Sequence, residues 1–177
     1  YGGRVCEVYT RDGARVFYKY NVLGELTHVV LPSGATLTYE YDHHHHILRE
    51  TRPHGQVVEN IYDAQSRVIE QRAAMGQAQA MTVTAKFEYS PECTIVMDAA
   101  GARTNYYLFD QQIYKVEDPL GGLITQSWFI DESHYLDGDT GEVKSYAGEG
   151  AYKRSLKRTV DKRGLSTSYH YDSRGNA

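Results

Sequence analysis

Polar and apolar residues alternate along several short segments of the chain. In residues 36–41, Leu37, Tyr39 and Tyr41 fall on one face of an extended strand, and the residues between them are polar. Residues 82–89 and 123–130 alternate in the same way. Because a two-residue period is typical of a sheet with two unlike faces, the sequence predicts an all-β protein.

Turn glycines recur at a nearly constant interval. Eight glycines follow a polar or proline-containing turn sequence, at steps of 21, 21, 21, 25, 20, 20 and 23 residues. They are Gly13, Gly34, Gly55, Gly76, Gly101, Gly121, Gly141 and Gly164. Glycine supplies the positive φ that many tight turns require, so this period indicates a chain of repeated units.

A second motif, Tyr-x-Tyr-Asp, lies between these glycines. Its copies occupy residues 18–21, 39–42, 60–63, 87–90, 107–110, 128–131 and 169–172, with a weaker copy at 146–149. Asp or Asn can open a turn by accepting a hydrogen bond from the backbone two residues further on. Each of about eight units therefore consists of a strand, a turn at Asp, a strand and a turn at Gly. Such units predict a run of antiparallel hairpins with two alternating kinds of turn.

Aligned units place aromatic residues in two rows. Tyrosine provides 16 of the aromatic residues, beside 4 Phe and 1 Trp. The first row holds Tyr18, Tyr39, Phe87, Tyr107, Trp128 and Tyr169, and the second holds Tyr20, Tyr41, Tyr62, Tyr89, Phe109 and Tyr171. The turn acids are Asp42, Asp63, Asp110, Asp131 and Asp172. All these residues are expected to be structural, because cross-strand aromatic pairs contribute about 0.2–1 kcal/mol each.

The predicted organisation is a single repeat segment over residues 1–177, incomplete at both ends. One hairpin alone is marginally stable, so the units are expected to form one continuous, curved sheet. Residues 72–81, rich in Ala and Gln, lengthen one unit by about six residues. They are expected to form an inserted loop in a longer hairpin or a short helix, which Gly76 would interrupt.

The pattern Tyr-x-Tyr-Asp-x-x-Gly resembles the YD repeats of the Rhs (rearrangement-hotspot) family. Toxin-complex shell proteins, wall-associated proteins and teneurins carry the same repeats. Residues 18–26 and 169–176 show the motif well, and residues 118–121 resemble the turn between repeats. The motif glycine is present as Gly24 and Gly175, and its slot elsewhere holds His45, Ser66, Cys93, Ile113, His134 and Tyr152. Those turns are expected to differ in shape, because a residue such as Ile adopts positive φ at a cost.

The resemblance implies a structural role. It implies a segment of a hollow β shell that encloses a C-terminal toxin or effector for delivery to other cells, within a secreted or cell-surface protein. The expected partners are further repeats of the same shell and the enclosed toxin domain. The alternative is a cell-surface adhesion or carbohydrate-binding surface, because aromatic faces also stack on sugar rings.

Composition excludes two other classes of partner. The net charge of −4 and the pI of about 6.1 argue against nucleic-acid binding, which needs a basic face. A continuous apolar run of about 18 residues is missing from the sequence, so this segment is not expected to insert into a membrane.

Four consecutive histidines, His43, His44, His45 and His46, are the weak candidates for metal binding. Neighbouring side chains of a strand point to opposite faces, so two of the four could reach one metal. A structural zinc site needs three or four ligands. The tract follows Asp42, where an exposed turn is expected, and the sequence therefore predicts no intrinsic metal and no cofactor.

No catalytic residues are expected. The acid pairs Asp137 with Asp139 and Asp131 with Glu132 lie in turn positions of the repeat. The serines lack the G-x-S-x-G context of an activated nucleophile, and Cys93 occupies a glycine slot of the repeat.

Overall fold

The computed structural model describes residues 3–76, 79–148, 153–172 and 174–176. These residues contain sixteen β-strands and one short 3-10 turn, Pro53–Gly55. Every strand pairing among them is antiparallel, so the prediction of an all-β protein built from antiparallel hairpins is confirmed. In the described ranges no helix is long and apolar enough to span a membrane.

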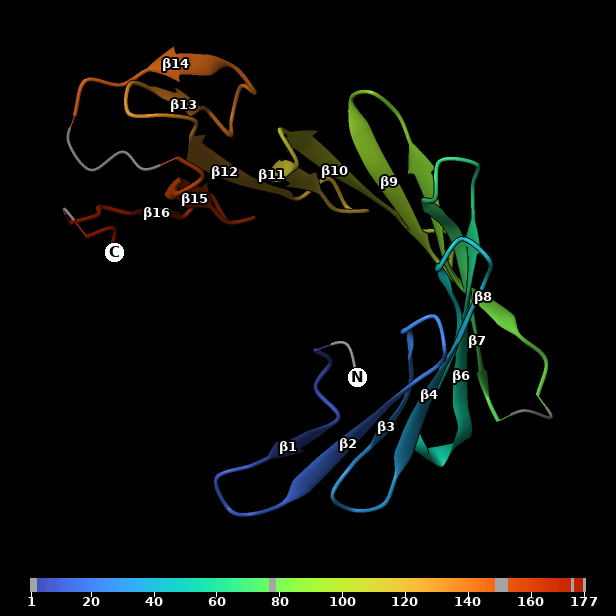
Figure 1. The fold of residues 1–177 in the computed structure, drawn as a ribbon. Coiled ribbons are helices and arrows are strands. Elements are labelled where there is room, and N and C mark those ends of the chain that lie inside the picture. Colours follow the sequence, from blue (N-terminus) through green and yellow to red (C-terminus); the bar gives the residue numbers. More distant parts are fainter. Residues whose placement is uncertain (1–2, 77–78, 149–152, 173, 177) are drawn as a thin grey trace. The chain divides into compact units, whose positions relative to one another are not determined.

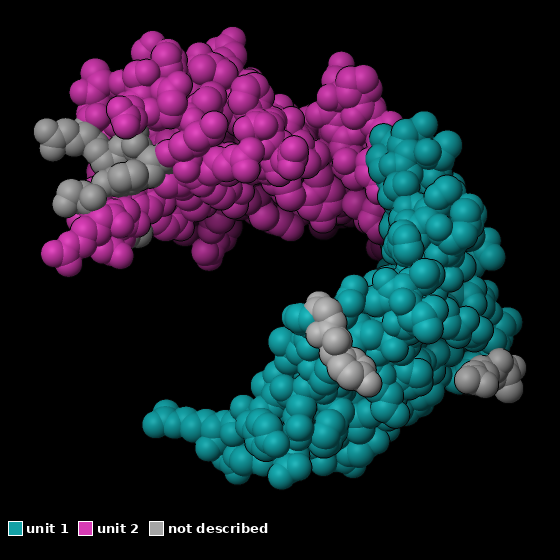
Figure 2. All heavy atoms as spheres, viewed as in Figure 1, with its two compact units in different colours: residues 1–86 teal, residues 87–177 magenta. Residues whose placement is uncertain are grey.

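The chain divides into two compact units, residues 1–86 and 87–177 (Figure 2). In the first unit successive strands pair with their neighbours in chain order (Figure 1). Its strands are β1 (Glu7–Tyr9), β2 (Arg15–Tyr20), β3 (Leu26–Val30), β4 (Thr36–Tyr41), β5 (Ile47–Thr51), β6 (Gln56–Tyr62), β7 (Val68–Met75) and β8 (Thr82–Tyr89), the last of which ends beyond the unit boundary.

The second unit begins in the same way and then departs from it. Its strands are β9 (Cys93–Asp98), β10 (Arg103–Phe109), β11 (Gln112–Glu117), β12 (Leu123–Phe129), β13 (His134–Leu136), β14 (Val143–Ser145), β15 (Leu156–Val160) and β16 (Ser166–Ser168). Strands β9 to β12 pair in chain order, but β15 returns to pair with β12. The β13–β14 hairpin is therefore inserted between two paired strands.

Ten of the turns share one backbone geometry. Each turn has five residues. The N–H of the first donates a hydrogen bond to the carbonyl of the fifth, and the N–H of the fourth donates one to the carbonyl of the first. They begin at Thr10, Asn21, Leu31, Asp42, Arg52, Asp63, Asp98, Asp118, Asp161 and Asp172. The prediction of two alternating kinds of turn was wrong. One three-residue loop recurs every 10 or 11 residues through the first unit, and two such steps make the 21-residue period.

The fourth residue of these turns has positive φ. Eight turns place a glycine there, but His45 and Ser66 adopt the same conformation, with φ of 69° and 64°. The expectation that these two turns differ in shape was wrong. Cys93 and Ile113 lie in β9 and β11 instead, and His134 begins β13, so their turns do differ. Tyr152 lies outside the described residues.

Few side chains of the first unit are fully buried. Val57 and Val58 of β6 and Ala74 of β7 are its buried apolar residues, and Val57 faces Ala74 across the strand pair. Most other strand residues are half-buried. A sheet with so small a core depends strongly on its hydrogen bonds.

The extension at residues 72–81 begins as strand. β7 runs through Met75, and its pairing with β6 continues to the end, where Gln56 faces Met75. Thr82 begins β8 and pairs with Ala73. Residues 77–78 lie outside the described part of the chain.

The inserted hairpin gives the second unit a second layer. Alternate residues of β12, namely Thr125, Ser127 and Phe129, are 8%, 5% and 3% exposed. The Ser127 hydroxyl accepts a hydrogen bond from the N–H of Gly138, 3.0 Å away. The turn at residues 137–141 therefore covers this face of β12. Leu136, which ends β13 and faces Trp128 of β12, is 1% exposed.

Leu136→Ala is expected to lower the free energy of unfolding of this unit by about 2–5 kcal/mol, because it leaves a cavity between the hairpin and β12. Urea denaturation followed by circular dichroism measures the change. Leu120, which is 95% exposed in a turn, provides the matched control, and Leu120→Ala should cost less than about 0.5 kcal/mol. Equal costs for the two variants would contradict the second layer.

Candidate functional site

The most regular side-chain interaction joins an aromatic residue to a backbone carbonyl fifteen residues earlier. It occurs five times in the described residues: from Tyr20 to Val5, Tyr41 to Leu26, Tyr62 to Ile47, Trp128 to Ile113 and Tyr171 to Leu156. The tyrosines donate through Oη and the tryptophan through Nε1, over 2.7–2.9 Å. We call these five contacts the aromatic clamps.

Each clamp reaches the preceding turn region of the chain. Tyr41 is the last residue of β4, and its acceptor Leu26 is the first residue of β3, directly after the Asn21 turn. Fifteen residues separate donor and acceptor because the chain must pass along β3, round the Leu31 turn and back along β4. A phenylalanine could fill the same space but could not donate this bond, which explains the preference for tyrosine in the second row.

Aspartate or asparagine holds the first position of seven of the ten shared turns. In each, the side-chain Oδ1 accepts hydrogen bonds from the backbone N–H groups of the third and fifth residues of the turn. These residues are Asn21, Asp42, Asp63, Asp98, Asp118, Asp161 and Asp172. The side chain satisfies two amides that the hairpin itself leaves without a partner, and it thereby fixes the turn.

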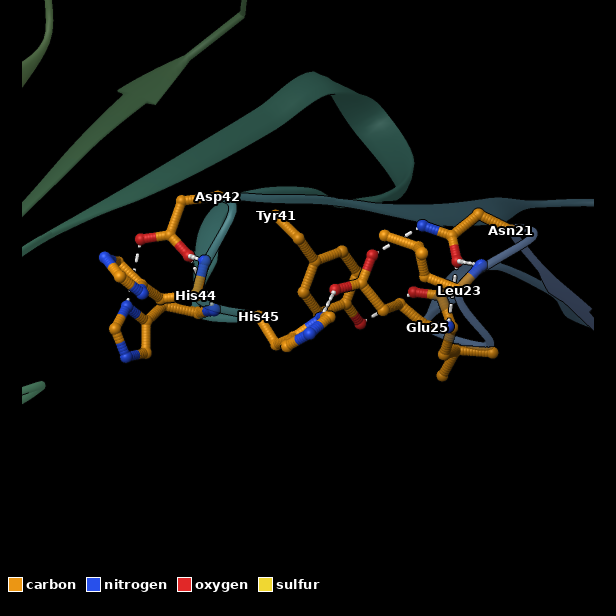
Figure 3. Close-up of polar contacts among 9 residues, drawn as sticks. Asn21, Leu23, Glu25, Tyr41, Asp42, His44 and His45 are labelled. Carbon is orange, nitrogen blue, oxygen red and sulfur yellow. Dashed lines mark hydrogen bonds and ion pairs between the residues drawn. The ribbon is translucent and has the colours of Figure 1, made fainter.

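The histidine tract forms the Asp42 turn, and its His45 ring lies beside Glu25 of the Asn21 turn (Figure 3). His45 Nδ1 lies 2.5 Å from Glu25 Oε1, and the other oxygen of Glu25 accepts a hydrogen bond from Asn21 Nδ2 at 2.5 Å. His46 stacks on Tyr62, with ring centroids 4.6 Å apart. Contacts of the tract therefore link the Asp42 turn to the Asn21 turn and to the end of β6, directly before the Asp63 turn.

Hydrogen bonding sets the charge state of the turn acids. Burial by itself would raise the pKa of Asp42, but the hydrogen bonds from the backbone N–H groups of His46 and His44 and from the His46 ring hold that pKa at about 2. At Asp131 the Ser133 N–H is the main cause of a pKa of about 2. The pKa of Asp63 is lowered chiefly by the Arg67 N–H, and that of Asp118 chiefly by Lys162. These carboxylates therefore remain ionised and bound to their turns at neutral pH.

The structure places several predicted repeat residues differently from the sequence alignment. Trp128 was assigned to the first aromatic row, but its clamp gives it the role of the second row. Asp110 was expected to open an Asx turn. It instead forms a two-residue turn with Gln111, both at positive φ, and its carboxylate pairs with Arg154 at 3.2 Å. Asp131 accepts the Ser133 N–H, as expected of a turn acid.

Other residues of the two rows differ in the contacts that they make within the described part of the chain. Tyr107 donates to Glu117 and lies 3.9 Å below the Lys115 ammonium group, whereas Tyr169 donates its backbone N–H to Lys157. Tyr18 and Tyr39 lie inside β2 and β4, Phe87 and Tyr89 inside β8, and Phe109 ends β10. A shared face for the whole first row stays a prediction.

The sequence alignment missed three turn acids, Asp98, Asp118 and Asp161. Each stands three residues before a glycine that the alignment had already marked as a turn glycine. The spacing Asp-x-x-Gly would have found all three.

The residues considered for catalysis are occupied by structural contacts. Asp137 pairs with Lys144, and Asp139 accepts a hydrogen bond from Thr125 at 2.5 Å and pairs with Arg158 at 2.9 Å. Ser127 is bound to Gly138, and Cys93 begins β9. Over the described ranges no three or more His, Cys, Asp or Glu side chains are grouped to hold a metal ion.

Comparison with known proteins connects part of this framework to a family. The model of the RHS Repeat family matches residues 20–57, which run from the Tyr20 clamp through the Asp42 turn into β6. The resemblance to the rearrangement-hotspot repeats is therefore confirmed for this segment. No curated protein matches the chain.

The chain is also similar to solved toxin-complex structures. It matches the Tc holotoxin pore of Photorhabdus luminescens at 10% identity and a TM-score of 0.31, over 94% of this chain and 12% of that one. It matches a TcdB2-TccC3-Cdc42 crystal structure at 10% identity and a TM-score of 0.32, over 94% and 13% of the two chains. The chain thus spans about an eighth of the length of these structures.

Tyr41→Phe is expected to lower the free energy of unfolding by about 0.5–1.5 kcal/mol, because it deletes the hydrogen bond to Leu26 and leaves that carbonyl without this donor. Chemical denaturation measures the change. Tyr39→Phe is the matched control on the same strand, since the Tyr39 hydroxyl makes no hydrogen bond with the described residues. A control that costs as much as Tyr41→Phe would refute the clamp.

Asp42 is expected to make the stability of its turn sensitive to acid. Its pKa is about 2 in the fold against an ordinary value of 3.8, so its contribution is complete above pH 3.8 and is lost as the pH falls through about 2. Asp42→Asn keeps the Oδ1 acceptor, as Asn21 does, but cannot titrate. Melting curves between pH 5 and pH 2 should therefore show a smaller loss of stability for Asp42→Asn than for the wild type.

Two further variants test this explanation. Asp42→Ala removes both amide contacts and should melt lower than Asp42→Asn at pH 5 and above. Asp110→Asn makes the same substitution at a carboxylate outside the Asp42 turn, and it serves as the control for the change of residue type. An Asp42→Asn protein as acid-sensitive as the wild type would exclude Asp42 as the titrating group.

Proposed function

We propose that this chain is a structural wall segment of a YD-repeat shell that encloses a C-terminal toxin or effector in a secreted or cell-surface protein. The observation that carries the proposal is the match of residues 20–57 to the RHS Repeat family. The same turn continues on both sides of that segment, from Thr10 to Asp63 at steps of 10 or 11 residues.

The distribution of the interactions supports a wall. Each turn acid fixes its own turn, and each clamp joins neighbouring segments of the chain, as Tyr41 of β4 binds Leu26 of β3. His45 adds a link from the Asp42 turn to Glu25 of the Asn21 turn. Strands β2 to β7 also pair with a neighbour on each side. These contacts stabilise an extended sheet without a thick core, which is the mechanical requirement of a thin container.

The partners follow from the same geometry. A repeat sheet grows by adding hairpins at its edges, so further repeats of the same shell are the expected neighbours. The toxin domain would occupy the space that the wall surrounds, and contact with it requires no catalytic residue from this chain.

Electron microscopy of the natural polypeptide that contains this chain tests the proposal. The expected result is a closed β shell in which residues 20–57 form neighbouring hairpins of the wall, with the density of a further domain inside. A sheet that encloses nothing would contradict the proposed function.

Limited proteolysis of the same polypeptide provides a functional measurement. A domain inside the shell should resist protease, and the triple variant Tyr20→Phe, Tyr41→Phe, Tyr62→Phe should shorten its lifetime because three adjacent clamps are lost. The double variant Tyr18→Phe, Tyr39→Phe changes first-row hydroxyls of β2 and β4 and is the control. If the wild type, the triple variant and the control protect the domain equally, the clamps do not contribute to its enclosure.

A further inference from the structure

We propose that His44 and His46 form a binding site for a late first-row divalent cation such as Zn²⁺ or Cu²⁺, with Asp42 as the positioning residue of His46. The site lies in the Asp42 turn and is independent of the role of the chain in a shell. Imidazole nitrogen is a preferred ligand of both cations.

The ring of His46 is held in one orientation. Its Nδ1 lies 2.9 Å from Asp42 Oδ2, and its face stacks on Tyr62 at an interplanar angle of 18°. The side chain is 18% exposed, so packing restrains it further. Because the ionised carboxylate engages Nδ1, the proton lies on Nδ1 and the lone pair of Nε2 is available to a metal. The same arrangement of carboxylate and histidine orients metal-binding imidazoles generally.

His44 lies within reach of the same cation. The centroids of the two rings are 5.8 Å apart. A metal bound at about 2.1 Å from a ring nitrogen lies about 3 Å from the ring centroid, so two ligating rings are separated by about 5–6 Å. The backbone of His44 is fixed by its N–H bond to Asp42 Oδ1 (Figure 3). Its ring is exposed, so rotation of the side chain can bring a ring nitrogen toward Nε2 of His46.

The other two histidines have different contacts. His45 is held by Glu25 in the neighbouring turn at 2.5 Å, and its ring makes no ring contact with His44 or His46 among the described residues. The ring of His43 lies against His44, with centroids 3.8 Å apart, and among the described residues it has no hydrogen bond to Asp42 and no ring contact with Tyr62. The structure therefore favours the pair of residues 44 and 46 over any other pair of the tract.

The chemistry of the site predicts a moderate affinity. The described residues bring no third His, Cys, Asp or Glu ligand to this point, so water must complete the coordination. A cation bound by two imidazoles and water binds reversibly, and Cu²⁺ should bind more tightly than Zn²⁺. Binding to the folded turn should also raise the melting temperature.

Calorimetric titration of the full chain with zinc chloride tests the proposal. The protein is purified without a metal-affinity column and treated with a chelator, because the tract itself would retain nickel. The wild type should bind one Zn²⁺ per chain in a saturable manner, with a rise in melting temperature. Absence of saturable binding would overturn the proposal.

Two double variants with equal numbers of histidines identify the ligands. His44→Ala with His46→Ala should weaken zinc binding at least tenfold. His43→Ala with His45→Ala should change it less than threefold. Equal losses of zinc affinity in the two variants would show that affinity depends only on the number of histidines. A larger loss in the second variant would place the ligands at His43 and His45. Either result would overturn the assignment to His44 and His46.

Asp42→Asn tests the positioning residue. The asparagine retains the Oδ1 acceptor of the turn, but its amide nitrogen replaces the carboxylate oxygen at Nδ1 of His46. Zinc affinity should fall about ten- to a hundredfold while the melting temperature at neutral pH without metal changes little. Unaltered affinity would show that Asp42 does not orient the ligand.

Discussion

The hydrogen bond from a tyrosine hydroxyl to the carbonyl fifteen residues earlier is the interaction on which this sheet depends most. Few side chains of the first unit are fully buried, so hydrophobic burial holds its hairpins together weakly. A directional bond from Tyr41 to Leu26 compensates, because it joins the end of β4 to the start of β3, the strand that precedes it. The same bond recurs at Tyr20 and Tyr62, each time between segments that a single turn connects.

The clamp is effective because the turns keep an almost constant spacing. Turn acids such as Asp42 bind two amides and fix where the hairpin reverses, and steps of 10 or 11 residues return each tyrosine to the same place. A slip of one residue would exchange the two faces of a strand and move the hydroxyl away from its acceptor. Neither residue is required in every turn: the turns at Leu31 and Arg52 keep the geometry without a turn acid, and His45 and Ser66 adopt the conformation that glycine has in the other turns.

The sequence predicts the local structure well because its signals are local. Alternation identifies the strands, and the Asp and Gly residues mark most turns. The side chains of Leu31 and Arg52 supply no turn acceptor, so these two residues do not indicate that their turns have the same geometry as the Asp42 turn.

The sequence also fails to predict features that depend on contacts between distant residues. The pairing of β12 with β15 inserts the β13–β14 hairpin, and the clamp from Trp128 to Ile113 uses an indole where the repeat has a phenol. The run of histidines also does not single out the proposed pair His44 and His46, because that choice depends on the contacts of His46 with Asp42 and Tyr62.

Residue-resolved amide hydrogen exchange on wild-type and Tyr41→Phe protein tests the central claim most directly. If the clamp holds β4 against the start of β3, loss of one hydroxyl should accelerate exchange in β3 and β4 and in the turn at Asn21, and it should leave the second unit unchanged. Exchange rates that are unchanged everywhere, or that rise equally along the whole chain, would contradict the account.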